Sequence, residues 1–102
     1  MVESLKERAK RFMADVPAEN VFRCVNGHIL RNLKELEAEL KTISEQDYAY
    51  HMNEQKHDFS NWVKDIIKDN SLAKTLLKAS TAAQAARDVT ARVSDLSKLI
   101  SR

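Results

Sequence analysis

The chain has 102 residues and a mass of 11.7 kDa, which suffices for one compact domain and excludes a multidomain enzyme. Apolar residues make up 43% and charged residues 31%, a balance that is typical of a globular chain and excludes a disordered tail. One glycine, one proline and few aromatic residues argue against a β-sandwich or barrel. The formal net charge of +2 is too small to indicate a nucleic-acid or membrane partner by itself.

The N-terminal residues 1–13 lack the apolar segment of a secretory signal, and no stretch reaches the roughly 18 apolar residues of a membrane span. Cys24 is the single cysteine and has no partner for an intramolecular disulfide. We therefore expect a cytoplasmic protein with no membrane partner, in which Cys24 is a buried hydrophobic residue without a catalytic role.

Residues 1–16 predict an amphipathic helix that Pro17 ends, because apolar residues recur there at intervals of three and four. Residues 21–30 predict a β-hairpin, since two β-prone runs meet at Asn26 and Gly27, a pair that favours a type I′ turn. A lone hairpin is marginal in water, so one of its faces must pack on helices.

The rest of the chain predicts helices whose starts are marked by capping residues. Asn32 and Thr81 are each followed three residues later by Glu35 and Gln84, a spacing that predicts capping boxes. The expected N-caps are Asn32, Ser44, Asp58, Asn70 or Ser71, and Thr81. The helix after Ser44 should be short, with one or two turns before residues 53–56.

The fold class is therefore mainly α, a compact bundle of about five helices with one small β-hairpin at about residues 21–30. We expect a single domain overall, in which an N-terminal helix (1–16) precedes a helical domain (21–102). The predicted core consists of Phe22, Leu33, Leu36, Leu40, Phe59, Trp62, Val63, Ile66, Leu72 and Leu76.

The last segment carries a heptad-like apolar seam. Its members follow at intervals of four and three: Ala82, Ala86, Val89, Val93, Leu96 and Ile100. A seam of nearly three heptads fits self-association and also fits packing on the core of the same chain.

Charge is distributed unevenly: residues 32–58 carry three lysines and seven acidic residues, whereas residues 59–102 carry eight basic and four acidic residues. Acidic and basic helices that pack as neighbours explain this pattern. The other interpretation is a nucleic-acid surface, with Asp65 and Asp69 interrupting it. It would consist of Lys64, Lys68, Lys74, Lys78, Arg87 and Arg92.

Enzyme chemistry finds little support in the motifs. Gly27 is the only glycine, so a phosphate-binding loop or dinucleotide fingerprint is excluded, and Cys-rich zinc motifs are absent from the sequence. We predict a non-enzymatic protein without a cofactor.

Residues 48–62 hold the densest group of polar and aromatic side chains. The candidate metal ligands there are His51, His57 and Asp58, but the two histidines are six positions apart and miss the helical spacing of zinc sites. The simpler interpretation is that Asp58 caps a helix while a histidine donates to that carboxylate or to a carbonyl.

Several motifs in this order resemble a small domain family of unknown function found mainly in archaea and some bacteria. They are Phe-x-x-x-Asn-Gly from Phe22, Asn-Leu-Lys-Glu-Leu from Asn32, Tyr-x-Tyr-His from Tyr48, Asp-Phe-x-x-Trp from Asp58 and Ser-Leu-Ala from Ser71. The resemblance covers residues 21–99 and implies that His51, Asp58 and Trp62 form one structural or binding unit. It implies no substrate or cofactor, and the family's commoner Asn at the position of His57 argues against His57 as an essential ligand.

The leading prediction is a protein-interaction or self-association module, with a protein partner or a second copy as ligand. Its expected contact residues are Tyr50, His51, Trp62, Val89, Val93, Leu96 and Ile100. The alternatives are a small-ligand or metal site at His51 and Asp58, and weak nucleic-acid binding through the basic helix stripe.

Overall fold

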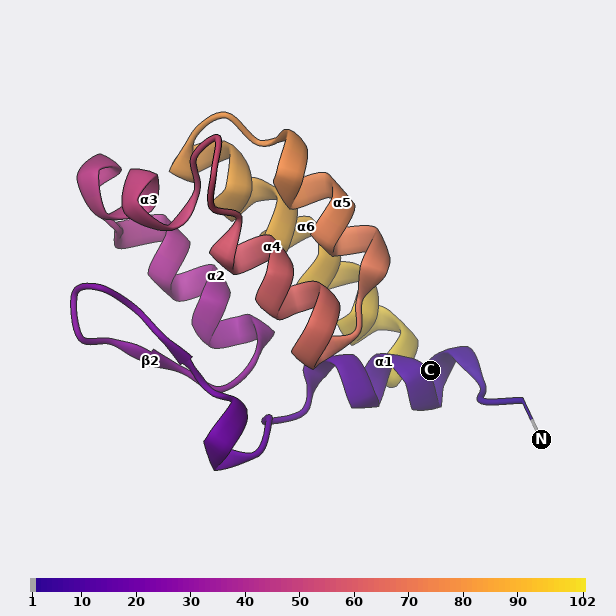
Figure 1. The fold of residues 1–102 in the computed structure, drawn as a ribbon. Helices are drawn as coiled ribbons and strands as arrows, with labels where there is room; N and C mark the ends of the chain where they lie inside the picture. The colour runs from indigo at the N-terminus through magenta and orange to yellow at the C-terminus, as the bar shows by residue number, and fades with distance from the viewer. Residues whose placement is uncertain (1) are drawn as a thin grey trace.

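The computed structural model describes residues 2–102 as a mainly helical bundle with a small hairpin at one side (Figure 1). Six α-helices are present in the described part, one more than the approximate number predicted, and the fold class is confirmed. The elements in chain order are α1 (Leu5–Met13), a 3₁₀ turn (Ala18–Asn20), β1 (Phe22–Arg23), β2 (Ile29–Leu30), α2 (Leu33–Thr42), α3 (Glu45–His51), α4 (Asp58–Trp62) with a π-helical extension (Val63–Ile67), α5 (Asn70–Lys78) and α6 (Ala82–Ile100). Helix α6 packs along both α2 and α1, and it also contacts α5, so it is the central helix of the bundle.

Local capping explains most helix starts. The side chains of Asn32, Ser44 and Thr81 each accept a hydrogen bond from a backbone N–H three residues later, as predicted. Neither predicted capping box closes, however, because the side chain of Glu35 accepts from the Arg31 N–H and Gln84 donates to Asp88. Glu35 and Gln84 therefore bond to other groups in place of the backbone N–H of the N-cap residue.

Two predicted caps are wrong. Helix α4 begins at Asp58 itself, whose carboxylate contacts His51 and Lys56 in place of the helix N-terminus. Helix α5 is capped by Asp69, which accepts from the Leu72 N–H, and not by Asn70 or Ser71. The Asp58 carboxylate is engaged by side chains in place of the helix N-terminus, whereas the cap of α5 lies one residue earlier than predicted.

Helix α1 belongs to the common core and does not project from it. Ala9 and Phe12 are buried in the same apolar cluster as the rest of the domain, and α1 lies across the C-terminal part of α6 (Figure 1). The helix starts at a capping box between Ser4 and Glu7, and it ends at Met13, earlier than the predicted stop at Pro17. Residues 14–16 are extended or bent, and Pro17 precedes the 3₁₀ turn.

The hairpin is present, but its turn differs from the prediction. The strands pair antiparallel, with Phe22 opposite Leu30. The Cys24 N–H donates to the carbonyl of His28 and the Gly27 N–H to that of Cys24, so the loop has three residues. Gly27 alone in this loop has a positive φ, of 93°, whereas a type I′ turn requires two such residues. The loop is thus a turn that ends in a glycine with a left-handed backbone conformation. Because it has three residues and a type I′ turn has two, the strands pair one residue away from the register that a type I′ turn would give.

The predicted core is confirmed except at one position. Phe22 and Phe59 stack at 4.7 Å between ring centroids, with Trp62 edge-on to Phe22 at 5.8 Å. Ile66 is only half-buried, whereas Ile67 is buried. The end of this helix is a π turn, whose wider spacing changes which residues face inward.

Lys68 ends the π turn with a φ of 75°, a left-handed conformation that glycine adopts without strain. We expect Lys68→Gly to raise the free energy of unfolding by about 1 kcal/mol, because the left-handed conformation costs a residue with a Cβ roughly 1 to 2 kcal/mol. The matched control is Lys64→Gly, inside the same helix, which should lower stability by about 1 kcal/mol. Urea unfolding of both variants checks the prediction, and effects of the same sign would contradict it.

Candidate functional site

His51 lies at the centre of the predicted polar-aromatic group and is 97% buried (3% exposed). Its Nε2 accepts the backbone N–H of Val25 at 3.0 Å, so this nitrogen carries no proton. Its Nδ1 must then carry the proton and donate to Oδ2 of Asp58, also at 3.0 Å. Both ring nitrogens are therefore engaged, and His51 connects the hairpin to the start of α4.

The three candidate metal ligands do not converge. Asp58 accepts from His51 and also pairs with Lys56 at 3.2 Å, while the backbone of His57 forms a bridge to Met52. Within residues 2–102, no three His, Cys, Asp or Glu side chains are placed to hold one metal ion. The histidine–carboxylate contact expected as the simpler interpretation is present.

The predicted interaction surface around His51 is divided between the core and the exterior. Trp62 is buried, and its Nε1–H donates to the carbonyl of Asn20 at 2.8 Å. Tyr50 is exposed, with the Lys56 ammonium 3.8 Å from its ring centroid. Because His51 and Trp62 are inside the protein, these residues do not form one contact surface.

The heptad seam faces the core of its own chain. Val89, Val93 and Leu96 are buried and Ile100 is half-buried, with α6 packed on α2 and α1. Of the two interpretations of the seam, the structure shows intramolecular packing. Val89, Val93 and Leu96 are consequently not exposed as contact residues for a second chain, whereas Ile100 and Ala82 are half-buried.

The hairpin loop is tethered by a second buried polar residue, Glu39 of α2. One carboxylate oxygen accepts from Nδ2 of Asn26 and the other contacts Nδ1 of His28, each at 2.7 Å. Burial raises the pKa of the neighbouring Cys24 thiol to about 12, and the Glu39 carboxylate adds to the shift. The thiol is protonated at neutral pH, so it is a poor nucleophile.

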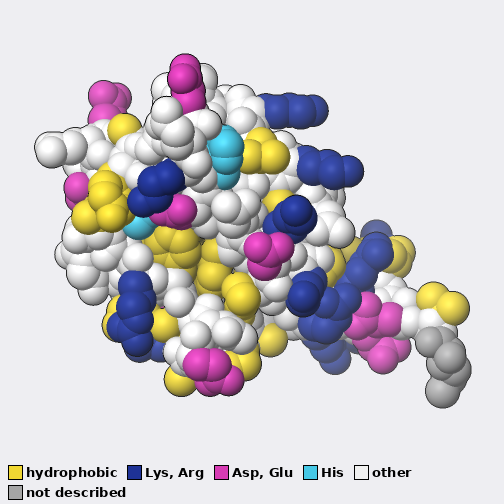
Figure 2. Space-filling model, viewed as in Figure 1, with side chains coloured by type: hydrophobic (Ala, Val, Ile, Leu, Met, Phe, Trp, Pro, Cys, Tyr) yellow, Lys and Arg dark blue, Asp and Glu magenta, His cyan; other side chains and the backbone are white. Residues whose placement is uncertain are grey.

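The lysines of the predicted basic stripe lie on the surface. Lys64, Lys68, Lys74 and Lys78 are exposed, and Figure 2 shows Lys and Arg side chains along the side formed by α5 and α1. Arg92 is different, because its guanidinium makes two hydrogen bonds, of 2.7 and 3.1 Å, to the buried carboxylate of Asp69.

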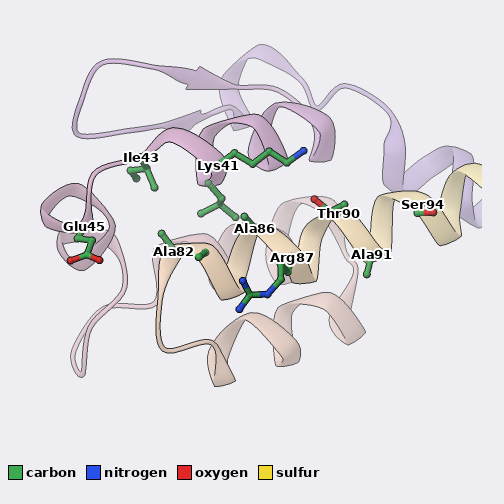
Figure 3. Close-up of a pocket in the computed structure, with 11 residues that line it drawn as sticks. Lys41, Ile43, Glu45, Ala82, Ala86, Arg87, Thr90, Ala91 and Ser94 are labelled. Carbon is green, nitrogen blue, oxygen red and sulfur yellow. The ribbon is translucent and has the colours of Figure 1, made fainter.

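A large hollow lies elsewhere, between the end of α2, the start of α3 and the outer face of α6. We name it the α2/α6 groove; it is open and has a volume of about 820 Å³. Its floor is apolar, with Leu40 and Ala86 buried beneath it. It is lined by Leu40, Lys41, Ile43, Glu45, Ala82, Ala83, Ala86, Arg87, Thr90, Ala91 and Ser94 (Figure 3).

Sequence reasoning missed this groove. The signal was the alanine-rich run of residues 82–91, in which small side chains also occupy the face of α6 beside the buried seam. Small side chains leave space above a helix, but only the placement of α2 and α3 turns that space into a groove.

None of the helices among residues 2–102 is both long and apolar enough to cross a membrane. No family model, curated protein or solved structure matches the chain, so the family resemblance stays a prediction.

Proposed function

We propose that this domain is a non-enzymatic protein-interaction module whose α2/α6 groove binds an amphipathic helix of a partner protein. The observation that carries the proposal is the open apolar groove with cations at its rim. The groove follows α6 from residue 82 to residue 94, which corresponds to about 18 Å of helix axis. A bound helix of three turns would fill that length with apolar residues at i, i+4 and i+7.

The small side chains of the floor favour a helix as the occupant. Ala82, Ala83, Ala86 and Ala91 allow the backbone of a second helix to approach α6 closely. The groove extends along about 18 Å of α6, a length that a helix of three turns fills and a small molecule does not. A polypeptide segment therefore uses this surface better than a metabolite does.

The charges at the rim favour an acidic partner. Lys41 lies on the α2 side and Arg87 on the α6 side, while Glu45 stands at the α3 end (Figure 3). Lys41 has only a 3.7 Å contact to Glu37, and Arg87 donates to the neutral Gln84, so both cations can pair with a ligand. Acidic residues beside the apolar stripe of the bound helix would complement them.

The test uses a designed amphipathic peptide of three to four turns with glutamates beside its leucine stripe, and a twin with lysines instead. In fluorescence anisotropy, we expect the acidic peptide to bind at least tenfold tighter, and the double variant Lys41→Glu/Arg87→Glu to reverse that preference. Ala91→Tyr should fill the groove and lower the affinity for the acidic peptide at least tenfold. Its matched control is Ala38→Tyr, on an exposed position of α2 outside the groove.

Three outcomes would overturn the proposal: no binding of either peptide, equal binding of both, or equal loss in Ala38→Tyr and Ala91→Tyr. Sedimentation velocity tests whether a second copy of this chain occupies the groove. A dimer that Ala91→Tyr dissociates would show that the groove binds a second copy of this chain, against a separate partner protein.

A further inference from the structure

The outward face of the hairpin carries two arginines around an apolar strip. Side chains alternate along the paired strands, so Phe22 and Leu30 face the core while Arg23 and Ile29, which are paired across the strands, face outward. Arg31 follows Ile29 by two residues and shares its face. Arg23, Ile29 and Arg31 therefore lie on one face of the hairpin and all line the same hollow.

A third segment turns this face into a hollow. The Val16 N–H donates to the carbonyl of Arg31 at 2.8 Å, which places residues 15–18 alongside β2. The hollow has a volume of about 290 Å³ and is lined by Asp15, Val16, Ala18, Val21, Arg23, Ile29 and Arg31. It lies apart from the α2/α6 groove and shares no lining residue with it.

Both arginines can engage a ligand. Arg23 makes no ion pair or side-chain hydrogen bond with another residue of the described chain. Arg31 has one long contact, 3.6 Å from Nη1 to Oε1 of Glu35, and both side chains of that pair are exposed. Such an exposed pair contributes little and yields to a better acceptor.

The backbone of Arg31 is nevertheless well fixed. Its N–H donates to Oε1 of Glu35 at 2.7 Å, and its carbonyl accepts from Val16. The single acidic side chain in the lining, Asp15, accepts from Nδ2 of Asn32 at 2.6 Å. The lining therefore keeps a net positive charge of one, with one anion held by a neighbouring amide.

We propose that this hollow, here called the hairpin hollow, binds a small organic phosphate monoester. Guanidinium groups match phosphate oxygens with paired N–H donors, and a phosphate monoester dianion offers two arginines a second charge and a third terminal oxygen that a carboxylate lacks. Val16, Val21 and Ile29 provide an apolar wall for the group that carries the phosphate. The proposal rests on this hollow alone and is independent of the groove.

The test follows the Arg Nε–Hε signals in ¹⁵N-resolved NMR during titration with inorganic phosphate, phenyl phosphate and benzoate. We expect saturable shifts at Arg23 and Arg31, with phenyl phosphate binding at least tenfold tighter than either other probe. The comparison with benzoate, which has a ring but one charge, measures the contribution of the second charge. The comparison with inorganic phosphate, which has no ring, measures the contribution of the apolar wall. A phosphotyrosine peptide forms a further arm: binding at least tenfold tighter than phenyl phosphate would overturn the assignment to a small molecule in favour of a phosphorylated protein.

Variants make the test specific. Arg23→Gln and Arg31→Gln should each lower the affinity for phenyl phosphate at least tenfold. Arg8→Gln, which changes an exposed arginine on α1, should leave that affinity unchanged. Ile29→Ser should remove the advantage of phenyl phosphate over inorganic phosphate. Unsaturable shifts, shifts of similar size at Arg8, or equal affinities for phenyl phosphate and benzoate would overturn the proposal.

Discussion

Asp69→Ala is expected to lower the free energy of unfolding by about 3 to 4 kcal/mol, because it removes a helix cap, worth about 1 kcal/mol, and the hydrogen bonds of a buried carboxylate to Arg92, worth about 1.5 to 3 kcal/mol. The Asp69 carboxylate is 1% exposed, accepts two hydrogen bonds from Arg92, and also caps α5 through the Leu72 N–H. The substitution thus removes the ion pair and the cap together. Urea unfolding followed by far-UV circular dichroism measures the loss.

Two variants give this prediction its controls. Asp95→Ala removes an exposed carboxylate on α6 and should change stability by no more than about 0.5 kcal/mol. Asp69→Asn keeps an oxygen for the cap and removes the charge, so its effect should lie between the other two. A loss below about 1 kcal/mol in Asp69→Ala would show that the pair does not hold α5 to α6.

His51→Ala is expected to lower the free energy of unfolding by about 3 to 4 kcal/mol, since it creates a cavity and removes two hydrogen bonds. The ring packs against Phe22 and Phe59 with centroid distances of 5.1 Å each. His51→Phe keeps a ring in that space and leaves the Val25 N–H without its acceptor. We expect that variant to lose about 2 kcal/mol, so the difference between the variants measures packing.

The matched control is His57→Ala, which changes the other histidine of this region and should have an effect below about 1 kcal/mol. Thermal and urea unfolding of the three variants compare them directly. Equal effects at His51 and His57 would contradict a special structural role for His51. Such a role also explains why His51 and Asp58 lie together, without the need for a metal ion between them.

The tethering of the hairpin supports the proposed site on its outward face. A two-stranded hairpin is marginally stable alone, and here its loop is held by His51 through Val25 and by Glu39 through Asn26 and His28. These contacts fix the hairpin from its inner side. The outward face with Arg23 and Arg31 is consequently presented on a rigid support, which a binding site requires.

Features that depend on neighbours within about four residues were predictable from the order of the amino acids. The caps at Asn32, Ser44 and Thr81 were predictable because a side chain there bonds a backbone group three residues away. The apolar stripes located most of the core for the same reason, since helical periodicity is local. Gly27 indicated a turn, although not its type.

The contacts between residues far apart in the chain were not predictable, because they form only when the helices pack together. Asp69 and Arg92 are 23 positions apart, and His51 bonds Val25 across 26 positions, distances at which no spacing rule applies. Helix α6 has a buried seam and a neighbouring face of small residues, and both patterns are visible in its sequence. Which of them remains open depends on where α1, α2 and α3 pack, because burial is a property of the assembled layers and not of a single helix.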